Sequence, residues 1–401
     1  KTRVLTRRLA HRVLTGSADA RHALVLTFTR EAAGELRRRL PSLGLTERVA
    51  AGTFHSIAHG LLRQRWADQG KRPREMLGDR DRLVRSVVRG SGGDEAVVAE
   101  VNWATTRGFD GEAYTRVVGR GERRGPADTR AVAAALDAYA AAKRERGQID
   151  VDDLLTLTIR ELDRDPAYRD ATRWRYRHVF VDEAQDLNPL QHRLVELLCP
   201  PGDPTADVFL VGDPAQAIYG FNGSDPELLV DVERHFPGVE VVRLPVNHRC
   251  TPQVVAAGAA VLTSGGQGEH AAGLVSARPD GPLVEIVAAD DEAAEAALVT
   301  RRVHALDPGL VRSGQVAVLA RTHAVLGGVA EALSSAGVPV RHSADGPGSQ
   351  LAPYLRLAYR ASGADQLRHW AHDHLEEASE VADVNPVAAA AASAVARAVL
   401  D

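Results

Sequence analysis

Short apolar runs that end abruptly in polar or acidic residues recur in the first half of the chain. Residues 178–181 are His-Val-Phe-Val and precede Asp182 and Glu183, and residues 208–211 are Val-Phe-Leu-Val and precede a Gly-Asp-Pro turn. A short run that is apolar throughout is typical of a parallel strand buried on both faces. In open α/β sheets, ligands bind beyond the carboxyl ends of the strands. The pattern therefore predicts a parallel sheet with a site at that edge.

Two further strands are expected near the start of the chain, over residues 23–29 and 49–56, each followed by apolar residues at helical spacing. Residues 70–149 differ, because charged and glycine-containing segments separate helical stretches there and no strand pattern appears. We interpret them as a helical insertion between two strands of the sheet. The alternation of strands and helices places the fold in the α/β class.

A second, shorter α/β pattern occupies the later part of the chain. After a strand over residues 239–244, a helix over residues 252–262 and a glycine-rich linker over residues 263–273, it contains strands over residues 284–287 and 316–319 and helices over residues 290–306 and 325–333. The pattern fades from about residue 341, and the acidic, then alanine-rich end predicts a helix or a frayed tail.

These changes divide the chain into five segments. We expect residues 1–69 and 150–249 to form the first α/β domain, 70–149 the helical insertion, 250–345 a partial second α/β domain, and 346–401 a helical or disordered tail.

Composition adds constraints on the class of protein. The 401 residues are 44% hydrophobic, which is enough for more than one core, and no apolar run is long enough to span a bilayer. Cys199 and Cys250 are the only cysteines. Two cysteines exclude a disulfide scaffold and a cysteine-based zinc site, and they are typical of a reducing cytosol. We therefore expect a cytoplasmic protein without a membrane partner.

Charge is unevenly distributed, although the formal net charge is only −4. Residues 1–50 contain eleven Lys and Arg against four Asp and Glu, whereas residues 270–401 contain ten against sixteen. Binding to a phosphate backbone requires such a basic segment, although a solvated charged face is the commoner explanation of a single cluster.

The acidic strand end has the chemistry that nucleotide hydrolysis needs. Mg²⁺ keeps much of its hydration shell and takes few protein carboxylates, a role that suits Asp182. Glu183 is placed to orient or deprotonate an attacking water, and Gln216, after the neighbouring strand, could sense a γ-phosphate. The alternative is that Asp182 or Asp186 merely caps the following helix. Two such strand ends, each with Asp and Gln, favour the nucleotide site.

The first two residues, Lys1 and Thr2, match the last two letters of a GxxxxGK[ST] phosphate-binding loop. In such a loop the lysine neutralises β/γ-phosphate charge, the hydroxyl ligates Mg²⁺, and a helix follows. Residues 3–14 have apolar positions at helical spacing. Lys-Thr alone means little, but with the acidic strand it indicates a chain that starts inside a phosphate loop.

Two of the predicted strands end in hydroxyl and aromatic residues. Thr27 and Phe28 end one, and Thr53 and His55 lie at the end of the other. Hydroxyls can bind backbone phosphates, and rings can stack on bases. Ordinary core filling is about equally plausible for each aromatic taken alone.

The ordered set of motifs resembles the UvrD/Rep/PcrA group of superfamily 1 DNA helicases. The stretches are Thr-Phe-Thr-x-x-Ala-Ala (27–33), Gly-Thr-Phe-His-Ser (52–56), Val-Asp-Glu-Ala-Gln-Asp (181–186), Val-Gly-Asp-x-x-Gln-x-Ile-Tyr-Gly-Phe (211–221) and Leu-x-x-Asn-x-Arg (244–249). Each is weak alone, but their order and spacing over about residues 1–340 are highly specific. The resemblance implies two RecA-like domains of the P-loop NTPase type and ATP-driven 3′→5′ movement on single-stranded DNA.

The resemblance also implies roles for individual residues. Glu183, Gln216 and Arg249 would be catalytic, and Lys1, Thr2, Asp182, Gln185 and His248 would bind ATP, with Thr2 and Asp182 holding Mg²⁺. The residues that would contact DNA are Thr27, Phe28, Thr53, His55, Tyr219 and Phe221. Expected partners are single-stranded DNA, single/double-strand junctions, and repair or replication proteins in the bacterial nucleoid.

Some positions depart from the family pattern. His248 stands where a tyrosine usually stacks on adenine, and Asn222 stands where an arginine is usual. The loop glycines before Lys1 and the motifs expected after residue 340 are missing, so we expect part of a longer helicase. A degenerate, non-hydrolysing relative that binds DNA or a partner is the main alternative. A phosphate-loop kinase or GTPase is a third hypothesis, against which the aromatic strand ends argue.

Overall fold

The structure is a computed structural model that describes residues 1–341 apart from 91–93, 126–127, 204, 206 and 221–222. The chain divides into two compact units, Lys1–Val284 and Glu285–Asp401. The predicted tail over residues 346–401 lies outside the described residues, as does Phe221.

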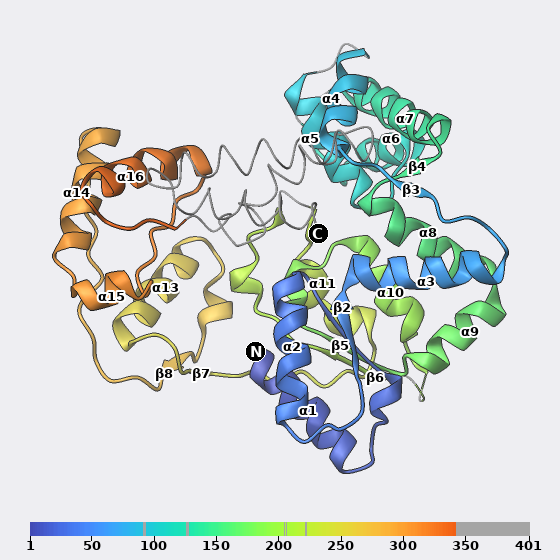
Figure 1. The fold of residues 1–401 in the computed structure, drawn as a ribbon, viewed down its shortest axis with the longest axis horizontal. Coiled ribbons are helices and arrows are strands. Elements are labelled where there is room, and N and C mark those ends of the chain that lie inside the picture. The colour runs from blue at the N-terminus through green and yellow to red at the C-terminus, as the bar shows by residue number, and fades with distance from the viewer. Residues whose placement is uncertain (91–93, 126–127, 204, 206, 221–222, 342–401) are drawn as a thin grey trace, which may run out of the picture. The chain divides into compact units, whose positions relative to one another are not determined.

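A four-stranded parallel sheet forms the centre of the first unit, with the strand order β2-β1-β5-β6 (Figure 1). The strands are β1 (Ala23–Thr27), β2 (Ala50–Thr53), β5 (His178–Val181) and β6 (Asp207–Leu210). Leu26 pairs with Gly52 on one side and with Val181 on the other, and Val181 pairs with Leu210. The four carboxyl ends therefore lie along one edge, as the apolar runs predicted.

Helices cover both faces of this sheet. Leu24 and Leu26 belong to one core cluster, with residues of α3 (Phe54–Asp68), α8 (Val151–Arg164) and α10 (Pro189–Leu198). Val25 and Phe180 belong to the other, with residues of α1 (Thr2–Leu14) and α2 (Arg30–Ser42). Because successive side chains of a strand point to opposite faces, a sheet buried on both sides needs runs that are apolar throughout.

The helical insertion has its own core, formed between α4 (Arg80–Gly90), α5 (Glu95–Thr105), α6 (Gly111–Gly119) and α7 (Thr129–Glu145). The prediction that this segment contains no strand is wrong in one detail. β3 (Glu75–Met76) and β4 (Gln148–Ile149) pair in parallel where the chain leaves and re-enters the first domain. Two-residue strands are too short to leave a period in the sequence, so only the fold shows them.

The remaining elements of the first unit are short, except for the helices α9 and α13. They are η1 (Ala20–His22), α9 (Pro166–Arg175), η2 (Ala184–Asp186), η3 (Pro214–Gln216), α11 (Glu227–Val230), α12 (Val232–His235), β7 (Val246–Asn247), α13 (Pro252–Ser264), η5 (Gly268–Ala271) and β8 (Val275–Ser276). The predicted strand over residues 239–244 is absent, and β7 pairs with β8 just after it. The segment predicted as a glycine-rich linker contains the end of α13 and η5.

The second unit contains α14 (Glu292–His304) and α16 (His323–Ser335), close to the predicted helices, and a short helix that was not predicted, α15 (Pro308–Arg312). The strands predicted over residues 284–287 and 316–319 are not formed. Ile286 is 96% exposed and Leu319 is 89% exposed. A strand requires a hydrogen-bonded neighbour, and no described segment of this unit pairs with either run.

No helix within the described part of the chain combines the length and the apolar character that a membrane span needs.

Candidate nucleotide-binding site

Five predicted site residues meet at the carboxyl edge of the sheet, although they are far apart in the sequence. The Lys1 ammonium group forms an ion pair with the Glu183 carboxylate and donates a 3.0 Å hydrogen bond to Gln216 Oε1. Beside this pair, Thr2 Oγ1 donates a 2.8 Å hydrogen bond to Asp182 Oδ2. The structure thus brings together the cation, the hydroxyl, both carboxylates and the amide.

The end of β5 fixes the two acidic side chains by backbone hydrogen bonds. The Asp182 N–H donates to the carbonyl of Leu26 in β1, and the Ala184 N–H donates to the carbonyl of Val211. Between them, Glu183 has a φ of +52°, the one positive φ of a non-glycine residue in the described chain. This left-handed conformation costs about 1–2 kcal/mol for a residue with a Cβ. The neighbouring strands therefore hold Glu183 in a strained turn, a feature that clusters at functional sites.

The environment shifts the two carboxyl groups in opposite directions. Burial raises the pKa of Asp182, which is only 2% exposed, and the negative charge of Glu183 raises it further against the Thr2 hydrogen bond. Burial also acts to raise the pKa of Glu183, but hydrogen bonds from Lys1 and Gln185 outweigh it and leave that pKa below its usual value. Glu183 is therefore the more readily ionised of the two.

Gln185 links the two strand ends. Its Nε2 donates to Glu183 Oε2 at 3.0 Å, and its Oε1 accepts the Asp213 N–H at 2.9 Å. Gln216 Nε2 in turn donates to Asp213 Oδ2 at 2.6 Å. Because Gly212 has no side chain, the Gln185 side chain can lie against the backbone there; a Cβ at that position would lie 2.8 Å from Gln185 Oε1.

Asp213 is a site residue that the sequence reasoning missed. Its carboxylate accepts the N–H of Ala215 as well as the amide of Gln216, so it both shapes the turn and orients the glutamine. The signal was present in the Asp-Pro-Ala-Gln sequence, because Asp before Pro is typical of a capped turn.

The alternative that Asp182 or Asp186 caps the next α-helix, α10, is wrong. Asn188 is the N-cap of α10, and its side chain accepts the Gln191 N–H at 2.8 Å. The side-chain oxygen of Gln191 in turn accepts the Asn188 N–H. Asp186 does not cap this helix, and burial raises the pKa of its carboxyl.

Lys1, Glu183 and Gln216 line an open cleft of about 2230 Å³ that His248 and Arg249 also line. The cleft exceeds the roughly 300–1,000 Å³ of an ordinary small-molecule pocket, so it has room for a nucleotide. The backbone N–H of Arg249 donates to Asn247 Oδ1 at 2.8 Å, and Arg249 is exposed. Arg249 and His248 therefore face the same cleft as the phosphate-loop residues.

The oxygen atoms of this site suit Mg²⁺. In an octahedral site with bonds of about 2.0–2.1 Å, neighbouring oxygen ligands lie about 2.9 Å apart. Thr2 Oγ1 and Asp182 Oδ2 are 2.8 Å apart. The pair thus has the spacing of two adjacent ligands, and the Lys1 ammonium group next to it can balance phosphate charge.

The residues predicted to contact DNA differ in exposure. Thr27 is buried at the end of β1, and Thr53 is the N-cap of α3, where its side chain accepts the Ser56 N–H at 3.2 Å. Phe28 is half-buried and lies against Phe54, with ring centroids 5.6 Å apart. The structure therefore places Thr27 in the core and leaves part of the Phe28 ring accessible.

Of the other two described residues, His55 is half-buried and Tyr219 is exposed. The His55 ring is half-buried, its Nε2 atom is buried without a hydrogen-bond partner among the described residues, and burial lowers its pKa. Tyr219 is 45% exposed. Phe221 lies outside the described residues.

A parallel sheet covered by helices on both faces, with Lys-Thr and an acidic strand end at its carboxyl edge, defines a RecA-like α/β domain. Residues 1–237 match the model of the UvrD/REP helicase N-terminal domain, and the chain belongs to this family. The resemblance inferred from the ordered motifs is therefore confirmed.

Known helicases with similar sequences come from several bacteria. ATP-dependent DNA helicase UvrD2 of Mycobacterium tuberculosis is 35% identical over 84% of the chain and 51% of the relative's length. UvrD1 of the same organism is 31% identical over 85% of the chain and 46% of its own length, and Rep of Salmonella typhimurium is 29% identical over 75% and 45%. The chain spans about half the length of the curated relatives it matches.

Proposed function

We propose that this chain is part of an ATP-dependent DNA helicase that moves 3′→5′ along single-stranded DNA. The observation that carries the proposal is the convergence of Lys1, Thr2, Asp182, Glu183 and Gln216 at one edge of the sheet. Membership of the UvrD/REP family supports it, because the similar proteins are named as ATP-dependent DNA helicases.

We assign a different role in ATP hydrolysis to each residue of the cleft. Thr2 and Asp182 would hold Mg²⁺, which would neutralise charge on the β- and γ-phosphates. The Lys1 ammonium group exchanges the Glu183 carboxylate for phosphate oxygens as ATP binds. This exchange frees the Glu183 carboxylate to accept the proton of the attacking water.

The other residues of the cleft sense and position the nucleotide. Gln216, oriented by Asp213, contacts the γ-phosphate, and Gln185 holds the Glu183 carboxylate in place. Arg249 stabilises the transition-state charge, a role that suits a planar and permanently charged guanidinium group. His248 stacks on adenine with an imidazole ring.

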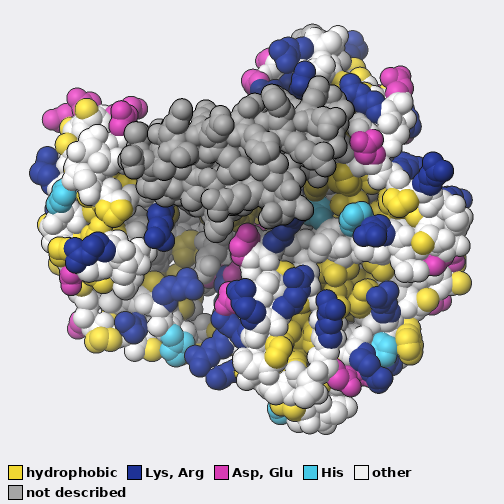
Figure 2. Space-filling view, in the orientation of Figure 1, with side chains coloured by type: hydrophobic (Ala, Val, Ile, Leu, Met, Phe, Trp, Pro, Cys, Tyr) yellow, Lys and Arg dark blue, Asp and Glu magenta, His cyan; other side chains and the backbone are white. Residues whose placement is uncertain are grey.

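The carboxyl edge of the sheet also presents the DNA contacts. We assign base stacking to Phe28, His55, Tyr219 and Phe221, because stacking on an aromatic ring does not depend on base identity. Thr27 and Thr53 shape the strand ends that carry these rings. Figure 2 shows Lys and Arg side chains over the face that carries α1 and α2, which would attract a phosphate backbone.

The biological setting follows from this activity. We assign the protein to the bacterial cytoplasm, at the nucleoid, where it acts on single-stranded DNA and on single/double-strand junctions. A function in repair or replication restart, with protein partners of those processes, is consistent with the UvrD and Rep names of the similar proteins.

The test is the substitution Glu183→Gln, with Glu331→Gln on the exposed surface of α16 as the matched control. We expect Glu183→Gln to reduce DNA-stimulated ATPase activity by about 10²–10⁴-fold, because the proton acceptor is lost while the Mg²⁺ ligands remain. Binding of ATP and of single-stranded DNA should change little, and Glu331→Gln should behave as the unaltered protein.

Two results would contradict the proposal. Hydrolysis at the normal rate by Glu183→Gln would remove the role assigned to Glu183. The absence of ATPase activity in the unaltered protein, with DNA binding retained, would favour the degenerate relative instead.

A further inference from the structure

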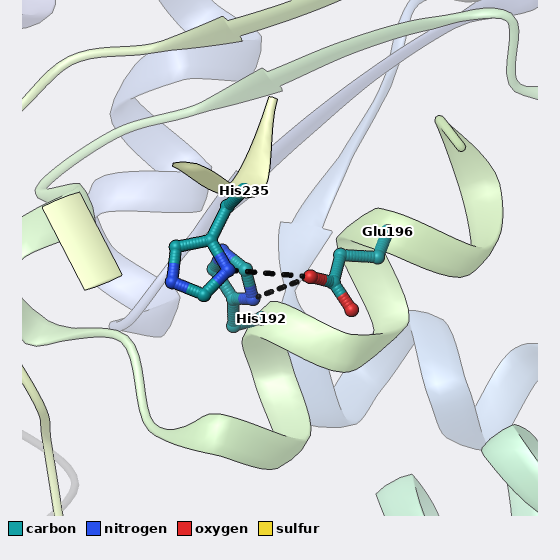
Figure 3. Close-up of side chains that lie close together, drawn as sticks. All are labelled: His192, Glu196 and His235. Carbon is teal, nitrogen blue, oxygen red and sulfur yellow. Dashed lines mark ion pairs between the residues drawn. The ribbon is translucent and has the colours of Figure 1, made fainter. Parts of the chain in front are cut away.

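Two histidines and a glutamate meet in the first unit, outside the nucleotide cleft (Figure 3). His192 and Glu196 lie one turn apart on α10, and His235 is the last residue of α12. Glu196 Oε1 is 3.5 Å from Nδ1 of His192 and 3.5 Å from Nδ1 of His235. None of the three residues lines the nucleotide cleft.

These separations are those of metal ligands rather than of strong hydrogen bonds. N–H···O hydrogen bonds are about 2.7–3.2 Å long, so both 3.5 Å contacts are too long for good ones. Zn²⁺ takes bonds of about 2.0–2.1 Å to histidine nitrogen and carboxylate oxygen, and tetrahedral angles then separate ligand atoms by about 3.4 Å. Both separations from Glu196 Oε1 thus match an edge of a tetrahedral site, and the three ligand atoms all lie within 4.8 Å of one another.

The His192 ring lacks hydrogen bonds that would explain its burial. The residue is 3% exposed, and its Nε2 is buried without a partner in the described part of the chain. The nitrogen available to a metal is Nδ1, which lies 3.5 Å from Glu196 Oε1, and coordination there would place the proton of the neutral ring on Nε2.

The surroundings orient the other ligands. Glu196 Oε1 is the carboxylate oxygen near the two rings, and the other oxygen, Oε2, lies 3.5 Å from Nη1 of the exposed Arg193. The His192 and His235 rings are 4.4 Å apart at nearly a right angle, and Phe236 packs beside His192. An apolar wall and an oriented carboxylate are usual features around a bound metal.

We propose that His192, Glu196 and His235 bind one divalent transition-metal ion, Zn²⁺ in the first instance, with water as the fourth ligand. Two imidazoles and a carboxylate suit Zn²⁺ and differ from the oxygen ligands that Mg²⁺ prefers. The ion would join α10, which follows Glu183 in the chain, to the segment that follows Gln216. It would therefore stabilise the packing of the segments behind the nucleotide site.

The experiment measures metal binding to the metal-free protein in the presence of excess Mg²⁺, which saturates oxygen-ligand sites. We expect one Zn²⁺ per chain by calorimetry, a thermal midpoint that rises with Zn²⁺ concentration, and the visible absorption of tetrahedral Co²⁺ when Co²⁺ replaces it. Loss of a residue outside the first ligand shell already costs about 10–100-fold in affinity, so His235→Ala should lose at least that much.

Two variants keep the test decisive if one of them folds poorly. His235 is partly exposed and can be replaced with little effect on the core, and Glu196→Gln keeps the size of the side chain while removing the charged ligand. His304→Ala, on the exposed surface of α14, is the matched control and should bind Zn²⁺ as the unaltered protein does. Absence of stoichiometric Zn²⁺ binding, or equal affinity in His235→Ala and the unaltered protein, would overturn the proposal.

Discussion

Glu183 shows how the fold imposes a conformation that its own sequence does not favour. The residue adopts a positive φ because the backbone on either side of it is held. The Asp182 N–H donates to the carbonyl of Leu26 in β1, and the Ala184 N–H donates to the carbonyl of Val211, the residue after β6. Its carboxylate then points to Lys1, which starts the chain, and to Gln185 two residues on. A single side chain thus joins the strand end, the phosphate-loop residue and the neighbouring turn.

The Lys1–Glu183 pair makes stability depend on pH in a defined direction. The folded-state pKa of Glu183 is lowered, so its contribution to the free energy of unfolding is present above the pKa of the unfolded state. This contribution is lost as the pH falls through the lower folded-state pKa. We expect the stability difference between the unaltered protein and Glu183→Gln to shrink as the pH falls below about 4, measured by urea unfolding. A difference that stayed constant with pH would show that the pair does not form in solution.

Asp150 is the residue on which the start of α8 depends. It forms a capping box with Asp153, and its carboxylate also accepts hydrogen bonds from Tyr139 at 2.6 Å and from Lys143 at 2.8 Å. The ion pair with Lys143 ties the end of the helical insertion to the first domain, which no local pattern could show.

This arrangement predicts that Asp150→Ala lowers the free energy of unfolding by a large amount. The carboxylate is 1% exposed, and its removal leaves the charge of Lys143 without one of its two partners, at a cost of about 3–5 kcal/mol in the free energy of unfolding. Asp150→Asn keeps the capping oxygen and should cost less. Chemical denaturation of both variants checks the order.

Asp128 supplies the matched control for this prediction, because it caps α7 through the Arg130 N–H but is exposed. Asp128→Ala should cost only the roughly 0.5–2 kcal/mol of an ordinary N-cap. Equal losses for Asp128→Ala and Asp150→Ala would mean that the buried ion pair contributes nothing beyond capping.

Prediction of the strands succeeded where an apolar run has hydrogen-bonded neighbours in the parallel sheet. The strands of the first sheet were predicted from apolar runs because helices bury both of its faces. The runs at 284–287 and 316–319 have the same composition, yet they are not strands. A strand is defined by its neighbour as well as by its own residues, so a run without one keeps an irregular backbone.

The whole chain consists of two units with very different cores. The first has large clusters on both sides of its sheet, whereas the buried cluster in the described part of the second, residues 285–341, consists of Ala296, Val303, Val329 and Leu333. Stability should therefore be concentrated in the first unit, because buried apolar area is the main favourable term in folding.

The exposure of Ile286 gives a direct test of the second unit. Ile286→Ala should change the free energy of unfolding by no more than about 0.5 kcal/mol, because the side chain is 96% exposed. Leu333→Ala, at 5% exposed, should cost about 2–5 kcal/mol as a buried large-to-small change. Urea unfolding compares the two. A loss for Ile286→Ala as large as that for Leu333→Ala would show that residues 284–287 pack as the originally predicted strand.

The sequence alone determined the class of the fold, the order of its first elements and the residues around the acidic strand end. It could do so because burial on both faces, helix capping and the abrupt change from apolar to acidic residues are local and leave a pattern. Tertiary structure decided which of those residues meet. Lys1 reaches Glu183, Asp213 orients Gln216, and His235 faces Glu196 only because sheet order and helix packing bring distant segments together.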